Sequence, residues 1–184
     1  MHALIIDKFL AKSNCATEKK QKQFLLKLLG NKLLITTILY SGSIHGWMYK
    51  DFHSRSYKKG PTIILFKVKD GDCIGGYTKA QWSSEDKSVR DSDAMLFNLS
   101  KERHFPNRGI GGEIMCGSAY GPHYGWLDLV AYEPYNGDRK CASYAGQNNY
   151  GITFENRKNM LTNTYDGNFT ITELEVWEVK EMAQ

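Results

Sequence analysis

Two apolar runs joined by a short polar turn constrain the fold of this chain more than any other feature. Residues 62–68 (TIILFKV) are nearly continuous in β-branched and apolar residues, which is typical of a strand covered on both faces. Residues 73–78 (CIGGYT) resume the extended pattern after Asp70-Gly71. Because a type I′ turn requires positive φ at its central residues, this arrangement predicts a hairpin in which Gly71 has positive φ.

Further segments are also typical of strands. Residues 33–40, 94–99 and 171–179 are rich in apolar and β-branched residues, whereas residues 105–168 give weaker strand signals among many Gly, Tyr and Asn residues. The polar stretch 83–92 predicts a surface loop. Many short strands with Gly-rich turns and few helices predict a β-sandwich with peripheral helices.

The last of these strands has an unusual pattern. Leu174 and Val176 face one way, and Glu173 and Glu175 face the other. Trp177 interrupts this division between apolar and polar faces, which predicts a β-bulge or a strand end near it.

Two helices are predicted before the first strand. Residues 3–12 place apolar side chains at helical spacing, and a second helix begins after Thr17, which we expect to cap it, and stops at Gly30. Its apolar stripe consists of Phe24, Leu25, Leu28 and Leu29, and the lysines around that stripe are Lys19, Lys20, Lys22 and Lys27. The stripe docks on the body of the protein or on a partner, and the body is favoured because a short helix needs tertiary packing to persist.

The charge of the chain is unevenly distributed. The net charge is +4, but residues 1–60 carry 11 Lys and Arg against 3 Asp and Glu, whereas residues 61–184 carry 13 against 17. Such asymmetry indicates either a solvated lysine-rich face or contact with an acidic protein surface. Nucleic acid is not an expected partner, because the isoelectric point of about 8.8 is only mildly basic and no known reader motif is present.

The composition also argues against several other classes of protein. The longest apolar run, residues 33–40, is far shorter than the ~20 residues that a transmembrane helix needs, so we expect no membrane insertion. The apolar N-terminus meets Asp7 and Lys8 too early for a signal peptide. The four cysteines form no CxxC pair, which disfavours a structural zinc site and favours a reducing, cytoplasmic location.

No motif predicts a catalytic, cofactor or metal site. The five histidines form no HxH or HxxxH pair, and the glycine clusters at 75–76 and 109–112 are neither a phosphate-binding nor a dinucleotide-binding loop. Glu113, which follows the second cluster, is a turn-capping acid or a buried carboxylate with a role. Cys73 and Cys116 lie in predicted strands, where a buried inert thiol is the default.

The order of several motifs is specific. Gly60-Pro61-Thr62 leads into a strand, Gly75-Gly76-Tyr77 follows in the hairpin, and Trp82 and Phe97 come after it. Later, Gly111-Gly112 precedes Glu113, and Trp177 lies in the closing strand. This pattern resembles the TLDc domain, the domain of oxidation-resistance proteins. The likeness covers residues 18–179, which leaves a helical N-terminal extension over 1–17 and a tail over 180–184, and residues 118–138 do not align with the family.

The resemblance implies an α+β, mainly β fold: a two-sheet antiparallel β-sandwich flanked by small helices. It also implies that the motif residues are structural, that no residue is catalytic and that no cofactor is bound. The expected function is that of a non-enzymatic interaction domain that binds a large intracellular, multi-subunit complex. For the family, that complex is the V-type ATPase, and the role is protection against oxidative stress.

Two alternatives stay open. The first is a structural component of a cytoskeletal assembly, microtubular or ciliary, held partly by Lys19, Lys20, Lys22 and Lys27. The second is a thiol-dependent redox or hydrolytic enzyme that uses Cys73 or Cys116 with a histidine. The location is cytoplasmic in each case, with attachment to a cytoskeletal or membrane-peripheral complex in the two binding interpretations.

Overall fold

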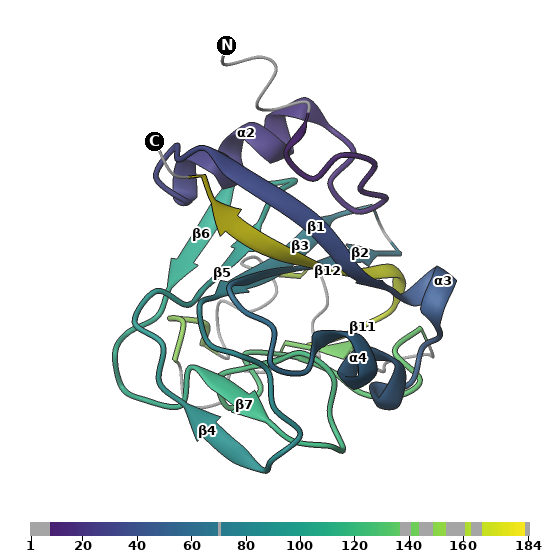
Figure 1. Ribbon diagram of the computed structural model, residues 1–184. Coiled ribbons are helices and arrows are strands. Elements are labelled where there is room, and N and C mark those ends of the chain that lie inside the picture. Colours follow the sequence, from purple (N-terminus) through teal and green to yellow (C-terminus); the bar gives the residue numbers. More distant parts are fainter. Residues whose placement is uncertain are drawn as a thin grey trace.

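Two antiparallel sheets stack face to face in the computed structural model (Figure 1), which describes residues 8–69, 71–136, 141–143, 149–153, 161–162 and 167–182. The first sheet has the spatial order β1 (Leu34–Ser41), β12 (Ile171–Glu181), β2 (Thr62–Val68), β3 (Cys73–Thr78), β5 (Met95–Asn98) and β6 (Arg103–Pro106). The second has the order β11 (Asn168–Phe169), β10 (Cys141–Ala142), β9 (Leu129–Ala131), β8 (His123–Tyr124), β7 (Ile114–Cys116) and β4 (Lys87–Val89). The predicted mainly β sandwich is therefore confirmed.

Three short helices at the periphery are labelled in the described part of the chain. They are α2 (Lys19–Leu28), α3 (Gly42–His45) and α4 (Tyr49–Ser56). Figure 1 shows α2 above the first sheet, α3 beyond the far end of β1, and α4 below the first sheet, on the side of the second.

The strand β2 is central and is covered on both faces, as its sequence predicts. Ile64 and Phe66 belong to the core between the sheets, together with Tyr124 from β8. Ile63 and Leu65 lie in a second cluster on the opposite face of the first sheet. The first sheet therefore separates two hydrophobic cores, which explains why β2 is apolar along nearly its whole length.

The helix α2 docks on the body of the protein. Leu25 and Leu26 are buried in the second cluster, and Phe24, Leu28 and Leu29 pack against that cluster. Docking of the predicted stripe on the body is therefore confirmed. Leu26, which was not part of the predicted stripe, is also buried there. The N-cap is Glu18 and not Thr17, and the side chain of Gln21 accepts a hydrogen bond from the Glu18 N–H at 3.1 Å.

The segment before α2 departs from the prediction of a helix over residues 3–12. Residues 1–7 lie outside the described part, and of residues 8–12 only Lys8 is helical. Leu10 and Lys12 have φ angles of 49° and 65°, in the left-handed region where a right-handed helix cannot continue. Phe9 and Leu10 are nevertheless fully buried, because the segment crosses the first sheet. The domain boundary placed at residue 18 stays a prediction.

The predicted hairpin is present between β2 and β3. Ile64 pairs with Gly76 in an antiparallel ladder, and the Val68 N–H donates to the carbonyl of Asp72 at 2.9 Å. Gly71 has a φ of +101°, so its predicted positive φ is confirmed. Asp70 lies outside the described residues, and the predicted turn type therefore stays a prediction.

The long strand β12 differs from the prediction at Trp177. Its alternation is unbroken there, since Glu173, Glu175 and Trp177 share one face and Leu174 and Val176 the other. A register shift does lie beside Trp177, but the extra residue is on the neighbouring strand, between Ile38 and Tyr40 opposite Trp177 and Val176. The strand β12 itself shifts register against β2 between Ile171 and Glu173. The strand runs on to Glu181, two residues beyond the predicted end.

The stretch 83–92 is not a simple surface loop. It contains β4, which pairs antiparallel with β7. Asp91 at its end is buried and accepts hydrogen bonds from the Thr78 hydroxyl and the Lys79 N–H at 2.5 and 2.6 Å. The polar composition therefore reflects one short edge strand and one buried acid. Composition alone does not distinguish such a segment from a surface loop.

Candidate interaction surface

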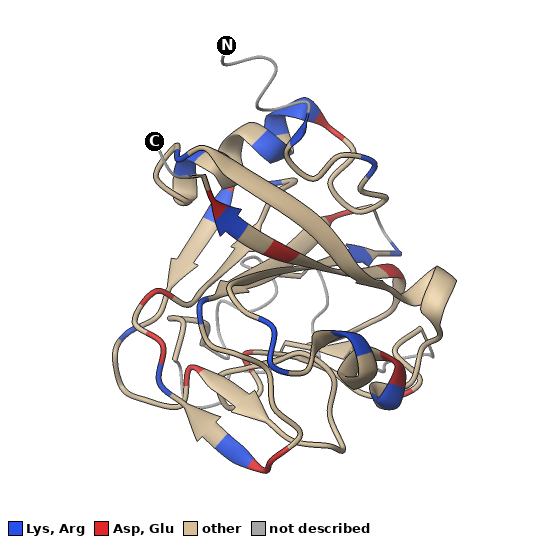
Figure 2. Ribbon diagram, viewed as in Figure 1, with Lys and Arg blue, Asp and Glu red and all other residues tan. Residues whose placement is uncertain are grey.

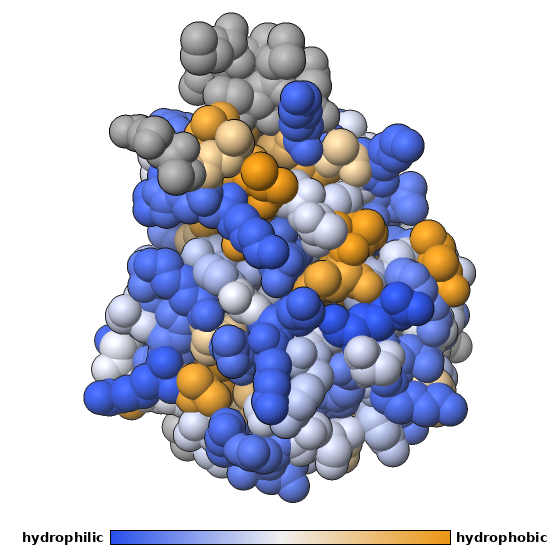
Figure 3. All heavy atoms as spheres, viewed as in Figure 1, coloured by the Kyte–Doolittle hydropathy of each residue, from blue (hydrophilic) through white to orange (hydrophobic). Residues whose placement is uncertain are grey.

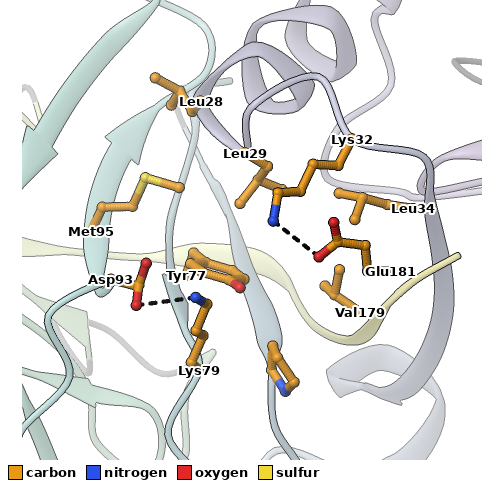
Figure 4. Close-up of a pocket in the computed structure, with 11 residues that line it drawn as sticks. Leu28, Leu29, Lys32, Leu34, Tyr77, Lys79, Asp93, Met95, Val179 and Glu181 are labelled. Atoms are coloured by element: carbon orange, nitrogen blue, oxygen red, sulfur yellow. Dashed lines mark hydrogen bonds and ion pairs between the residues drawn. The ribbon is translucent and has the colours of Figure 1, made fainter. Parts of the chain in front are cut away.

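A groove of about 240 Å³ lies on the outer side of the first sheet, beside the C-terminal end of α2 (Figure 4). Five elements and the loops next to them contribute its walls, and all of them reach the same end of the sheet because the strands are antiparallel. The lining residues are Leu28, Leu29, Lys32, Leu34, Pro61, Tyr77, Lys79, Asp93, Met95, Val179 and Glu181. We call this feature the α2 groove.

The floor of the α2 groove is apolar. Leu28 and Leu29 come from the end of α2, and Met95 and Val179 come from the facing strands. Tyr77 lies among them, and burial raises the pKa of its phenol to about 12. An apolar floor with a few polar groups around it is the usual composition of a binding site.

Two ion pairs lie on the rim of the groove, as the dashed lines in Figure 4 show. The Lys32 Nζ is 2.9 Å from the Glu181 carboxylate, and the Lys79 Nζ is 3.1 Å from the Asp93 carboxylate. All four side chains are about half exposed, so each pair contributes only ~0–1 kcal/mol to stability. The rim can therefore exchange its ion pairs for contacts with a partner at little cost.

Several residues of the family motifs between residues 60 and 82 lie in or next to the α2 groove. Pro61 and Tyr77 line the groove, whereas Thr62 is buried and accepts a hydrogen bond from the Trp82 Nε1–H at 2.8 Å. An ideal Cβ on Gly60 would lie 2.5 Å from the carbonyl oxygen of Ala80. The motif thus joins the start of β2 tightly to the loop after β3.

The glycine pair 75–76 packs closely against neighbouring groups of both sheets. A Cβ on Gly76 would stand 2.6 Å from the ring of Tyr124 in the second sheet, and one on Gly75 would stand 2.0 Å from the carbonyl oxygen of Ile64. Only glycine permits so close an approach. Phe97, on the next strand, is fully buried in the second cluster.

The later motif residues hold two loops together. Glu113 is buried and accepts hydrogen bonds from the Gly111 N–H at 3.0 Å and from the Asp91 N–H at 3.3 Å. Gly112 has positive φ and faces the Trp126 indole nitrogen. Both expectations for Glu113 thus hold in part, because the acid is buried and also caps the turn at Gly111.

The four lysines predicted to contact a partner lie outside the α2 groove. Lys19, Lys20 and Lys27 are exposed, and Figure 2 shows blue on the surface of α2. Lys20 pairs with Glu18 at 3.0 Å, and the Lys22 ammonium donates to the carbonyl of Leu10 at 2.9 Å. The groove lysines Lys32 and Lys79 were not predicted, since no local pattern marks a residue that meets the groove only after folding.

Sequence reasoning also did not predict what covers the acidic face of β12. Glu175 is fully buried beneath the segment 13–16 and accepts hydrogen bonds from the Ser13 hydroxyl, the Asn14 N–H and the Trp177 Nε1–H. Glu173 accepts hydrogen bonds from the hydroxyl groups of Ser41 and Ser43. The signal was the presence of Glu173 and Glu175 between the apolar residues of 171–177.

The thiols are buried and free. Cys15, Cys73, Cys116 and Cys141 form no disulfide, and burial raises the pKa of each thiol above its ordinary value. A protonated thiol is a poor nucleophile. In the part of the chain that the structure describes, no three His, Cys, Asp or Glu side chains gather in a way that could hold a metal ion.

Two more buried titratable residues flank the turn between β8 and β9: His123 lies in β8, and Asp128 directly precedes β9. Burial raises the pKa of Asp128 to about 7 and lowers the pKa of His123 to about 4. A backbone hydrogen bond from Asn149 partly offsets the effect of burial on the pKa of Asp128, and the Leu127 N–H donates to His123 Nε2 at 3.4 Å. Both side chains are buried and neither lines the α2 groove.

No helix among the described residues has the length and apolar content that crossing a membrane requires. The described helices end after at most ten residues.

The chain is similar over most of its length to three curated proteins, each named MTOR-associated protein MEAK7. The identity is 23% over 159 residues for the protein from Xenopus laevis, 26% over 159 residues for that from Gallus gallus and 25% over 162 residues for that from Danio rerio. Each match covers 80% of this chain. The chain spans about a third of the length of these relatives, with 32%, 32% and 33% covered.

The family model of the TLDc domain matches residues 9–180, nearly the whole chain. The match contains the motifs around Gly60, Gly76, Gly111 and Trp177 as well as both sheets. This chain therefore belongs to the TLDc domain family.

Proposed function

We propose that this chain is a non-enzymatic protein-interaction domain that binds a subunit of a multi-subunit assembly. The observation that carries the proposal is the α2 groove, whose apolar floor of Leu28, Leu29 and Met95 opens between exchangeable ion pairs. A groove of this kind suits an apolar anchor of a partner protein. The name of the three relatives, MTOR-associated protein MEAK7, supports a role in a protein complex.

The proposed assembly is the peripheral sector of the V-type ATPase, and the proposed cellular role is protection against oxidative stress. Both proposals come from the resemblance of the motifs to the TLDc family. A cytoplasmic location follows from this choice of partner. The buried and protonated thiols of Cys73 and Cys116 favour a binding role over a thiol-dependent enzyme.

The test is direct binding of the purified chain to the purified peripheral sector of a V-type ATPase, measured by biolayer interferometry. Leu28→Asp places a charge in the floor of the groove, and we expect at least tenfold weaker binding. The control is Ile110→Asp, which makes the same kind of change at an isoleucine that is 54% exposed and lies outside the groove. Equal loss of affinity in both variants, or no binding by the parent chain, would contradict the proposal.

A second candidate function is a structural role on an acidic lattice such as microtubules. It is favoured by Lys19, Lys20 and Lys27, which are exposed while Leu25 and Leu26 of the same helix are buried. Binding through such lysines weakens steeply as the salt concentration rises.

Co-sedimentation with microtubules at low and high salt tests this second function. A triple variant with Ser at 19, 20 and 27 should lose binding, whereas a control with Ser in place of the exposed lysines Lys50, Lys58 and Lys69 should retain it. Salt-independent sedimentation, or an equal loss in both triple variants, would exclude a role for α2.

A further inference from the structure

The strand β1 is an open edge of the first sheet. It pairs with β12 on one side, and in the described part of the chain no strand pairs with its other side (Figure 1). Its eight residues, LITTILYS, include no charged side chain and no proline. Natural edge strands are usually protected by charges, prolines, bulges or short length, and of these features β1 has only the register shift between Ile38 and Tyr40.

The hydrogen bonds around β12 determine which groups of β1 point outward. The Met182 N–H donates to the carbonyl of Leu33 at 2.9 Å, and on the other side of β12 the Val179 N–H donates to the carbonyl of Pro61 at 2.9 Å. Alternate residues of an antiparallel strand bond to opposite neighbours. In the register that pairs Leu34 with Glu181, the N–H and C=O groups of Leu34, Thr36 and Ile38 therefore point away from β12.

Three apolar side chains along this edge are exposed, whereas Leu34 is buried. Ile35 is 50% exposed and Ile38 is 41% exposed, and Leu33 lies next to the start of the strand with 39% exposure. Figure 3 shows hydrophobic side chains along the path of β1. The register shift between Ile38 and Tyr40 disrupts only the far end of the edge, which leaves residues 33–38 regular.

The chain segment before this edge is rich in lysine, although the neighbouring strand β12 contributes Glu178 and Glu181, and Glu181 pairs with Lys32 at 2.9 Å. The segment 8–33 carries seven lysines and one acid, Glu18. Lys12 is exposed and lies two residues after Leu10, whose N–H donates to the Thr36 hydroxyl oxygen at 2.8 Å, and Lys32 directly precedes the edge. A partner that lies along this edge is therefore favoured by negative charge.

We propose that residues 33–38 of β1 form a strand-addition site for an extended acidic segment of another protein, one in which β-branched residues alternate with Asp or Glu. Main-chain hydrogen bonds to Leu34, Thr36 and Ile38 give affinity, and acidic side chains near Lys12 and Lys32 give selectivity. A second copy of this chain is a poorer partner, since residues 33–41 offer no acid to compensate the lysines. The site adjoins the α2 groove, with which it shares Lys32 and Leu34, and it goes beyond the proposed function by specifying the form of the partner.

Fluorescence anisotropy with synthetic peptides tests the site. The probe is a fluorescein-labelled octapeptide of alternating Val and Glu, compared with the same peptide bearing Lys in place of Glu. A third peptide carries N-methyl groups on alternate residues, on the edge that would face β1, and so cannot complete the ladder. We expect the Glu peptide to bind at least tenfold more tightly than either of the other two, and equal affinities would overturn the proposal.

The chain variant that matches this test is Ile38→Pro. It removes one outward N–H and leaves the N–H groups that bond to β12 in place, while Ile38→Val keeps the donor and serves as the control. We expect loss of peptide binding only in the proline variant. If Ile38→Pro fails to fold, the N-methylated peptide still decides the question because it acts on the parent chain.

Analytical ultracentrifugation of the parent chain completes the test. A monomer that binds the Glu peptide supports the proposal, and a dimer that Ile38→Pro dissociates would overturn it in favour of a second copy. Leu28→Asp in the α2 groove should leave peptide binding unchanged. Failure of the groove proposal and failure of the edge proposal are therefore distinguishable.

Discussion

The Ser13 hydroxyl donates a hydrogen bond of 2.6 Å to the Glu175 carboxylate, although 162 residues separate the two along the chain. The same carboxylate accepts from the Asn14 N–H at 2.7 Å and from the Trp177 Nε1–H at 2.9 Å. Because Glu175 is fully buried, these donors replace the water that its charge loses on folding. The N-terminal segment and the last strand are thus held together by one buried charge.

Removal of that contact should destabilise the fold. Ser13→Ala deletes one hydrogen bond to a buried charge, which is worth about 1.5–3 kcal/mol, and also the hydrogen bonds that the Ser13 hydroxyl oxygen accepts from the Cys15 and Ala16 N–H groups. For a domain of this size, ~1 kcal/mol corresponds to a fall in Tm of about 2–4 °C. Differential scanning calorimetry should show this fall, whereas Thr17→Ala, at an exposed position of the same segment, should change Tm by less than about 1 °C. Equal Tm values for Ser13→Ala and the parent would show that the contact does not stabilise the fold.

The turn at Gly71 gives a second stability prediction. Its φ is +101° and no atom lies within 4 Å of an added Cβ, so Gly71→Val is strained by the backbone alone. We expect a cost of about 1–3 kcal/mol. Gly71→Asn should cost less than Gly71→Val because Asn tolerates positive φ. Thermal melts and binding assays on both variants distinguish a structural role of the turn from a role as a partner contact. If the Val variant is as stable as the parent but no longer binds, the turn is a contact site.

The buried Asp128 predicts a pH dependence of stability. Burial raises its folded pKa from the ordinary value of 3.8 to about 7, so the carboxyl group ionises at lower pH in the unfolded state than in the folded state. The stability that the protonated form provides is present below pH 4 and is lost as pH rises towards 7, by at most about 1.4 kcal/mol per pH unit.

Urea denaturation between pH 4.5 and 8 measures this effect. Asp128→Asn should remove the loss with rising pH, and the exposed control Asp86→Asn should keep it. His123 acts in the opposite direction, because its lowered pKa of about 4 gives stability that is present above pH 6.5 and is lost as pH falls towards 4. A parent chain and an Asp128→Asn variant with parallel pH profiles would contradict the assignment.

The four thiols should be unreactive in the folded chain. Cys15, Cys73, Cys116 and Cys141 are all buried, and burial raises the pKa of each. Titration with a disulfide reagent at pH 7.5 should modify none of them within minutes, and addition of denaturant should expose four. Rapid modification of Cys73 or Cys116 without denaturant would restore the thiol-dependent enzyme as an alternative.

The sequence by itself determined the central elements of this protein. The continuous apolar run of β2 predicted a strand covered on both faces, and Gly71 after it predicted the hairpin, because both signals are local and follow from backbone geometry. The apolar stripe of α2 likewise predicted docking on the body, since a short helix must bury such a stripe. The order of the glycine and tryptophan motifs then indicated the family.

Only the tertiary structure decided where these elements place their surfaces. Nothing near Lys32 or Lys79 in the sequence indicates that Glu181 and Asp93 meet them across a groove, and the cover over Glu175 comes from the opposite end of the chain. The edge position of β1 is equally invisible locally, because an exposed apolar strand and a buried one share the same composition. The physical reason is that groove, edge and buried charge arise from pairings between distant segments, whereas strands, turns and helices arise from near neighbours.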